Sequence, residues 1–186
     1  MRKIKLQMQM SVDGFVAGPN GELDWMTFNW DDKLKNYVIA LTEPVDCILM
    51  GRVLAQGFIP HWTAALENPQ PGEDEFALKM VETPKVVFSR TLESIEWAHT
   101  RLATQALAEE VRQIKQQAGK DIIVYGGAGF VSGLAEANLI DEYHLFVNPT
   151  AIGNGRRIFT GPTPLKLVGS QAFECGIVVN QYAPAG

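Results

Sequence analysis

The feature that most constrains this chain is an apolar run, Asp121–Tyr125, that passes directly into the glycine-rich segment Gly126–Gly129. A helical pattern follows over residues 130–137. Short apolar runs bounded by turn residues are typical of strands buried on both faces. A strand that enters a helix through such a turn is the repeating unit of an open α/β sheet, in which ligands bind at the carboxyl ends of the strands. The sequence therefore predicts an α/β protein with a ligand site near residue 126.

Other parts of the chain repeat this alternation. Further strands are expected at residues 4–10, 47–50, 85–88, 95–103, 143–147, 165–173 and 176–182. Helices are expected after Asp31, over 53–57, 76–81 and 107–118, whereas residues 59–75, with three prolines, read as an irregular surface loop or lid. Strands that alternate with helices favour a mostly parallel sheet, and the last two strands can pair antiparallel. We predict a single domain over residues 1–186 with three α/β/α layers.

Composition limits the function classes. The 186 residues are 46% hydrophobic and 20% charged, which is typical of a globular domain. A net charge of −5 disfavours nucleic acid as a partner. No signal peptide or membrane span is expected, so the cytoplasm is the default location. Cys47 and Cys175 lie far apart and are expected to be free thiols, and no zinc spacing, P-loop or serine-hydrolase elbow is present.

Three segments, each just after an expected strand, could bind phosphate. Gly126, Gly127, Ala128 and Gly129 form the first, where backbone N–H groups at a helix start favour an anion. The second is Gly51–Arg52, and the third is Ser89–Arg90 with Thr91, whose hydroxyl and guanidinium groups suit a 2′-phosphate and so favour NADP over NAD. Each segment has a plainer interpretation as a tight turn, a surface arginine or a polar loop. Their shared position at strand ends is more informative than any one of them.

Asp13 is the candidate proton-handling residue. It follows the first strand within Ser11–Gly14, where a carboxylate could bind substrate or act as an acid or base. An aspartate that bonds its own turn is an equally good interpretation. The sequence leaves both open.

The order of these motifs resembles a known family. The first strand leads into Ser11–Ala17 and then Gly18–Trp25; Ile48–Arg52, Val87–Arg90, Tyr125–Ala128, Asp141–Tyr143 and Pro149–Gly155 follow. Together they resemble the dihydrofolate-reductase-like superfamily, in the branch of the riboflavin-biosynthesis reductase (RibD C-terminal) domain and its stand-alone bacterial relatives. The resemblance covers nearly the whole chain.

The resemblance implies an NADPH-dependent reductase that transfers hydride to a C=N or C=O bond of a small, heterocyclic, pterin-like or aminopyrimidine-like substrate. It places the cofactor phosphates at Gly51 and Arg52, the adenosine 2′-phosphate at Ser89 and Arg90, the pyrophosphate at residues 126–129 and the nicotinamide by Val16 and Ala17. It also implies a homodimer.

Two departures from dihydrofolate reductases motivate an alternative. Leu54 stands where those enzymes have a threonine, and Lys35 falls near the position of their helix acid. The alternative is a non-catalytic protein that binds a nucleotide or small ligand on the same fold. A flavin or another nucleotide in the same groove is a third possibility.

Overall fold

A single sheet organises the protein. The computed structural model describes residues 1–68 and 74–186. Within them the eight strands have the order β4-β3-β2-β5-β1-β6-β8-β7. Their bounds are β1 Ile4–Met10, β2 Val45–Gly51, β3 Lys85–Phe88, β4 Thr100–Leu102, β5 Asp121–Val124, β6 Glu142–Val147, β7 Leu165–Ala172 and β8 Val178–Pro184. Strands β1 to β6 run parallel to one another, and β8 pairs antiparallel with both β6 and β7.

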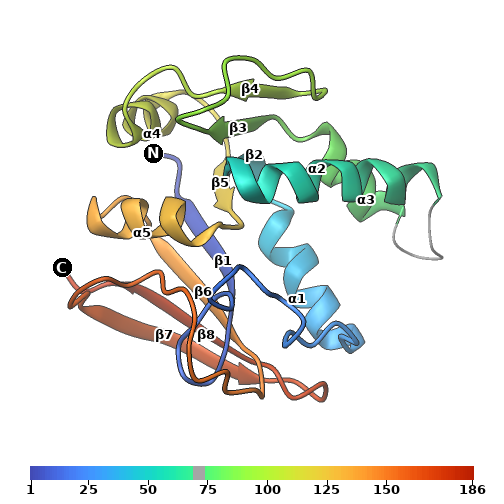
Figure 1. The fold of residues 1–186 in the computed structure, drawn as a ribbon, viewed down its shortest axis with the longest axis vertical. Coiled ribbons are helices and arrows are strands. Elements are labelled where there is room, and N and C mark those ends of the chain that lie inside the picture. The colour runs from blue at the N-terminus through green and yellow to red at the C-terminus, as the bar shows by residue number, and fades with distance from the viewer. Residues whose placement is uncertain (69–73) are drawn as a thin grey trace.

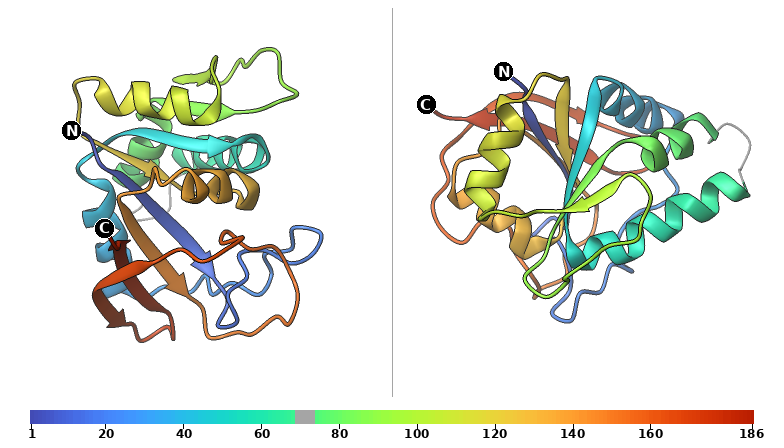
Figure 2. Two further views of the ribbon diagram at one scale, coloured as in Figure 1. Left: turned by 90° about the vertical axis from the view of Figure 1, so that its left-hand side faces the viewer. Right: turned by 90° about the horizontal axis from the view of Figure 1, so that it is seen from above.

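Helices cover both faces of the sheet, as Figures 1 and 2 show. Their bounds are α1 Asp32–Thr42, α2 Arg52–Glu67, α3 Asp74–Glu82, α4 Leu107–Gln116 and α5 Ala128–Glu136. Helices α4 and α5 pack on one face, and α1, α2 and α3 pack on the other. The predicted three-layer arrangement, with a mostly parallel sheet and an antiparallel C-terminal pair, is confirmed. None of the described helices is long and apolar enough to cross a membrane.

The alternation of β1 sets its two faces. Its apolar residues pack against Val111 of α4 and Leu134 of α5 in the largest core cluster. These apolar residues are Ile4, Leu6, Met8 and Met10. The intervening Lys5, Gln7 and Gln9 therefore face the other layer, because successive side chains of a strand point to opposite faces. This polar face in the middle of a parallel sheet is unusual, since such strands are generally apolar on both sides.

Helix α2 corrects the prediction of an irregular stretch over residues 59–75. The helix continues through Pro60 to Glu67, and α3 begins at Asp74. Ala55 and Ile59 of α2 are buried in one core cluster. This apolar face outweighs the hydrogen bond that Pro60 cannot donate, because tertiary packing supplies most of the stability of a helix. The remaining prolines of the stretch, Pro69 and Pro71, lie outside the described residues.

The parallel strands define two edges that are used below. The carboxyl edge is where β1, β2, β3, β5 and β6 end, and the amino edge is where they begin. Cys47 is a buried free thiol, as expected, and Cys175 is also free.

Candidate functional site

The glycine turn between β5 and α5 lies at the carboxyl edge, as predicted. Gly127 caps α5 without a side-chain hydrogen bond, and Gly126 has a φ of 131°, a conformation that L residues rarely adopt. The peptide bond between these two glycines is cis. The first N–H groups of a helix have no intrahelical acceptors, and here no capping side chain supplies one.

The Gly51–Arg52 turn meets the glycine turn directly. The Gly51 N–H donates to the Gly126 carbonyl over 3.2 Å. A Cβ on Gly51 would lie only 3.1 Å from Cβ of Phe130, a tight contact, so a glycine here favours the close approach of the two turns. Gly51 caps α2, again without a side-chain hydrogen bond. Two uncapped helix N-termini therefore converge at one point of the carboxyl edge.

Open space lies over the start of α5. A Cβ added to Gly127 or to Gly129 would meet nothing within 4 Å. Helix N-termini carry partial positive charge and suit an anion. Half-buried Arg52 begins α2 beside them, and its Nη1 donates to Gln56 over 3.1 Å. Unfilled space, free N–H groups and a guanidinium are what a pyrophosphate needs.

The β3 end reaches the same edge. Phe88 stacks on Phe130 of α5 with ring centroids 4.8 Å apart, which ties this strand end to the glycine turn. The Ser89 hydroxyl accepts from the N–H groups of Thr91 and Leu92, so it holds its own turn. Arg90 is exposed and forms no salt bridge with any residue that the structure describes. The Arg90 guanidinium is thus available to a ligand, whereas the Ser89 oxygen already accepts two backbone hydrogen bonds.

Asp13 clamps a distant loop. One carboxylate oxygen accepts from the Ser11 hydroxyl (2.7 Å) and the Ile152 N–H (3.1 Å), and the other accepts from the Gly153 N–H (2.7 Å). The Ser11 hydrogen bond, followed by those from the backbone, lowers the pKa of Asp13 to about 2. The group is therefore ionised near neutral pH and already occupied by donors. This geometry supports a positioning role better than acid–base work, because the carboxylate joins its own turn, through Ser11, to residues 152–153.

Val16 and Ala17 belong to the same clamp. The Val16 N–H donates to the Arg156 carbonyl, and the Arg156 N–H donates to the Ala17 carbonyl, both over 2.8 Å. Both residues are buried. Arg157 lies over the Phe15 ring, 4.2 Å from its centroid. The structure thus places two basic residues beside this segment, which the sequence alone did not link to it.

Asn148 is a further residue whose role was not predicted from the sequence. Fully buried at the end of β6, it accepts from the Thr27 N–H and donates to the Gln9 side chain, both over 2.8 Å. It joins the ends of β1 and β6 to the segment before α1. The signal that could have found it is the polar face of β1, because buried Gln7 and half-buried Gln9 need polar partners.

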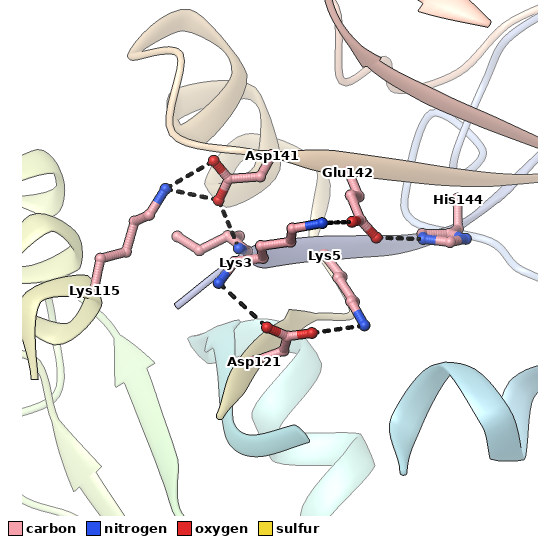
Figure 3. A network of polar contacts seen from close by, with 8 residues as sticks. Lys3, Lys5, Lys115, Asp121, Asp141, Glu142 and His144 are labelled. Carbon is pink, nitrogen blue, oxygen red and sulfur yellow. Dashed lines mark hydrogen bonds and ion pairs between the residues drawn. The ribbon is translucent and has the colours of Figure 1, made fainter. Parts of the chain in front are cut away.

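The amino edge is chemically different. Buried Arg2 pairs with Asp46, Lys3 with Glu142 (2.7 Å), Lys5 with Asp121 (2.8 Å) and Lys115 with Asp141 (2.6 Å). Figure 3 shows the last three of these pairs, in which Lys3, Lys5 and Lys115 contact their carboxylates. Four basic residues at this edge are thus paired with acids of the same chain, whereas Lys85, at the start of β3, donates to the carbonyls of Val81 and Thr83 instead.

Two further observations bound the site. No group of three or more candidate metal ligands occurs among residues 1–68 and 74–186. A cavity of about 310 Å³ lies between α5 and residues 158–165, with Tyr143 and Pro184 in its wall. None of its lining residues belongs to the turns described above, so we base the site on the convergence of the turns and not on this cavity.

The fold of the chain, together with known proteins that resemble it, identifies the class of protein to which it belongs. The protein has the fold of dihydrofolate reductase: the enzyme from Enterococcus faecalis, solved with NADP(H), superimposes with a TM-score of 0.62 at 11% identity, over 99% of this chain and 97% of that one. The chain belongs to the RibD C-terminal domain family, whose model matches residues 2–179.

Two other proteins illustrate the family. The Bacillus subtilis (strain 168) protein YyaP is 32% identical over 188 residues, which is 97% of this chain and 94% of that protein. The Thermotoga maritima diaminohydroxyphosphoribosylaminopyrimidine deaminase/5-amino-6-(5-phosphoribosylamino)uracil reductase has a TM-score of 0.69 at 18% identity, and the match covers 99% of this chain but 57% of that one. The family and its fold neighbours point to an oxidoreductase with a nicotinamide cofactor.

Proposed function

We propose that this protein is an NADPH-dependent reductase that transfers hydride to a C=N or C=O bond of a pyrimidine-type substrate. The observation that carries the proposal is the convergence of two uncapped, glycine-started helices beside an unfilled space at the carboxyl edge. Membership of the RibD C-terminal family and the uracil reductase activity in the name of the Thermotoga protein support it.

The residues present fit a dinucleotide phosphate. In the proposal, the N–H groups of Ala128 and Gly129 bind the pyrophosphate, and Arg52 neutralises it from the start of α2. Arg90, which is exposed and has no acidic partner among residues 1–68 and 74–186, binds the 2′-phosphate and so selects NADPH over NADH. Val16 and Ala17 form a fixed wall for the nicotinamide, because their backbone is pinned to Arg156. When bound, the cofactor supplies the hydride.

Asp13 has a supporting part in this proposal. By holding the N–H groups of Ile152 and Gly153, it fixes residues 150–157 against the segment that faces the cofactor. A fixed geometry accelerates a bimolecular transfer because the reacting groups are already oriented. We place Asp13 as a positioning residue and not as the proton donor.

The test is consumption of NADPH by the purified protein with a panel of aminopyrimidines and pterins. Steady NADPH oxidation that depends on one of these compounds is the expected result. Oxidation that proceeds equally with NADH, or with no added heterocycle, would contradict the proposal.

A non-catalytic ligand-binding protein is the second candidate, favoured by one observation. Two acids near the expected substrate side already accept hydrogen bonds from backbone N–H groups. Asp31 accepts from Leu34 and Cys175, and Asp13 accepts from Ile152 and Gly153. Tight NADPH binding without turnover across the panel would select this candidate. We also propose a homodimer, which sedimentation of the purified chain would test.

A further inference from the structure

The polar face of β1 is the starting point. Lys5, Gln7 and Gln9 lie on the face covered by α1, although β1 sits between two parallel neighbours in the middle of the sheet. Two of the three are matched: Lys5 pairs with Asp121 at 2.8 Å, and the Gln9 oxygen accepts from Asn148 at 2.8 Å. Gln7 is different.

The Gln7 side-chain oxygen is enclosed and has no hydrogen-bond partner among the described residues. The residue as a whole is only 7% exposed. Buried polar atoms are nearly always hydrogen-bonded, and each exception calls for an explanation. An apolar residue would suit this enclosed strand position. The chain instead places here an acceptor oxygen that receives no hydrogen bond from any described residue.

Its neighbour on β6 cannot supply the missing donor. His144 lies opposite Gln7 in the β1–β6 register and is itself buried. Its Nδ1 is 2.6 Å from the Tyr37 hydroxyl, and its Nε2 is 3.4 Å from a Glu142 carboxylate oxygen, a contact drawn in Figure 3. Because a carboxylate only accepts, Nε2 carries the proton and Nδ1 accepts from Tyr37. Burial lowers the pKa of His144, so the ring stays neutral and both nitrogens are engaged.

The neighbour on β5 is also engaged. Tyr125 follows Val124, the partner of Leu6, so it lies beside Gln7 in the same row of the sheet. Its hydroxyl donates to the Met80 sulfur at 3.6 Å. Its ring lies 5.2 Å from that of Phe58 on α2. Gln7 is thus flanked by aromatic rings on either side, from Tyr125 and from His144 with Tyr37.

The position of this row relates it to the proposed cofactor site. Gly126 follows Tyr125 directly and begins the glycine turn. Along β1, half-buried Gln9 lies between Gln7 and the carboxyl edge. The polar face therefore runs inward from the same edge at which the helix N-termini converge.

We propose that Gln7 is a specificity-determining residue, whose Oε1 accepts a hydrogen bond from an N–H group of a planar nitrogen heterocycle bound on this face of the sheet. The inference rests on the proposed reductase function and names the group that reads its substrate. Aromatic neighbours suit a flat ring, and a lone acceptor suits a ligand that presents a donor.

The test compares Gln7→Met with Gln171→Met, a matched change at an exposed position of β7. The probe is 5,6-diaminouracil, titrated by calorimetry into each protein saturated with NADP⁺. We expect wild type and Gln171→Met to bind the probe and Gln7→Met to bind it about tenfold more weakly, the scale of one lost hydrogen bond. Gln7→Met should melt no lower than wild type, because the change removes the buried carboxamide oxygen that has no partner among the described residues.

Two results would overturn the inference: equal probe affinity in wild type and Gln7→Met, or no binding of the probe to the wild-type complex. NADP⁺ affinity is measured first on all three proteins. Its absence in wild type refutes the cofactor site itself, whereas intact NADP⁺ binding with an unaffected probe refutes only the role of Gln7.

Discussion

The two edges of the sheet treat charge in opposite ways. At the amino edge, lysines and an arginine are matched by aspartates and glutamates of the same chain. At the carboxyl edge, Arg52 and Arg90 form no salt bridge with any described residue, and two helices begin without a side-chain cap. Ion pairs within the chain stabilise a fold, whereas positive groups without an acidic partner can bind an anion. From this contrast we propose a structural role for the amino edge and a ligand-binding role for the carboxyl edge, and we expect changes at the two edges to have separable effects.

The largest expected effect is on stability at the amino edge. Asp46→Ala should lower the free energy of unfolding by about 2–3 kcal/mol, because it leaves the buried Arg2 guanidinium without its carboxylate. Asp46 is itself partly open to water, which keeps the loss at the lower end of the range for buried pairs. Denaturant unfolding measures the loss, and NADPH affinity of the folded variant should not change. A weakened affinity would contradict the separation of the two edges.

Arg90→Ala is the converse change at the carboxyl edge. We expect NADPH affinity to fall by about 2 kcal/mol, roughly 30-fold, while NADH affinity and stability stay as they are. The reason is that only NADPH carries the 2′-phosphate. Calorimetry with both cofactors is the measurement, and Lys166→Ala on exposed β7 is the control. Equal weakening of both cofactors would remove the 2′-phosphate role from Arg90.

Replacing two helix glycines should have smaller effects, but comparing the two variants is a more specific test of the proposed site. Gly57 in α2 and Gly129 in α5 both have nothing within 4 Å of an added Cβ. Replacement by alanine should stabilise the protein by about 0.5–1 kcal/mol at the interior position 57 and at most that much at position 129, near a helix start. Only Gly129→Ala should weaken NADPH, because its methyl group would enter the space assigned to the pyrophosphate. If both variants bind NADPH alike, the pyrophosphate does not lie over α5.

The smallest expected effect concerns pH. Because hydrogen bonds lower the pKa of Asp13 to about 2, its contribution to stability is complete above its unfolded pKa of about 4 and is lost only as the pH falls towards 2. Between pH 5 and 9 Asp13 should therefore cause no inflection in the rate of NADPH oxidation. Wild type and Asp13→Asn should give pH profiles of the same shape, even if Asp13→Asn is slower overall. An inflection that vanishes in Asp13→Asn would restore Asp13 as an acid or base.

Much of the fold could be predicted because strands and helices leave periodic signals. The strands predicted at 47–50, 85–88 and 121–125 lie within two residues of the bounds of β2, β3 and β5, and the glycine and arginine residues that follow them do lie at one edge. Helix α2 could not be predicted past Gly57, because its stability comes from packing against the sheet, which local propensity does not reveal.

The site was harder to predict than the fold. Turn residues such as Gly51 and Gly126 were found because they carry a local signature. Ile152 and Gly153, which donate to Asp13, lie about 140 residues from it in sequence, and Asn148 lies equally far from its partner Gln9. Only the three-dimensional fold brings these residues together. Gln7 was visible in the sequence only as one polar residue in an alternating strand, and its enclosed oxygen is a property of the packed structure.

The most direct test of the account is the affinity of the wild-type protein for NADPH and NADH, measured side by side by calorimetry. The account predicts tight binding of NADPH and clearly weaker binding of NADH, since the unmatched positive groups of the carboxyl edge are assigned to phosphates. Failure to bind either cofactor, or equal affinity for both, would contradict the claim that this edge is an NADPH site.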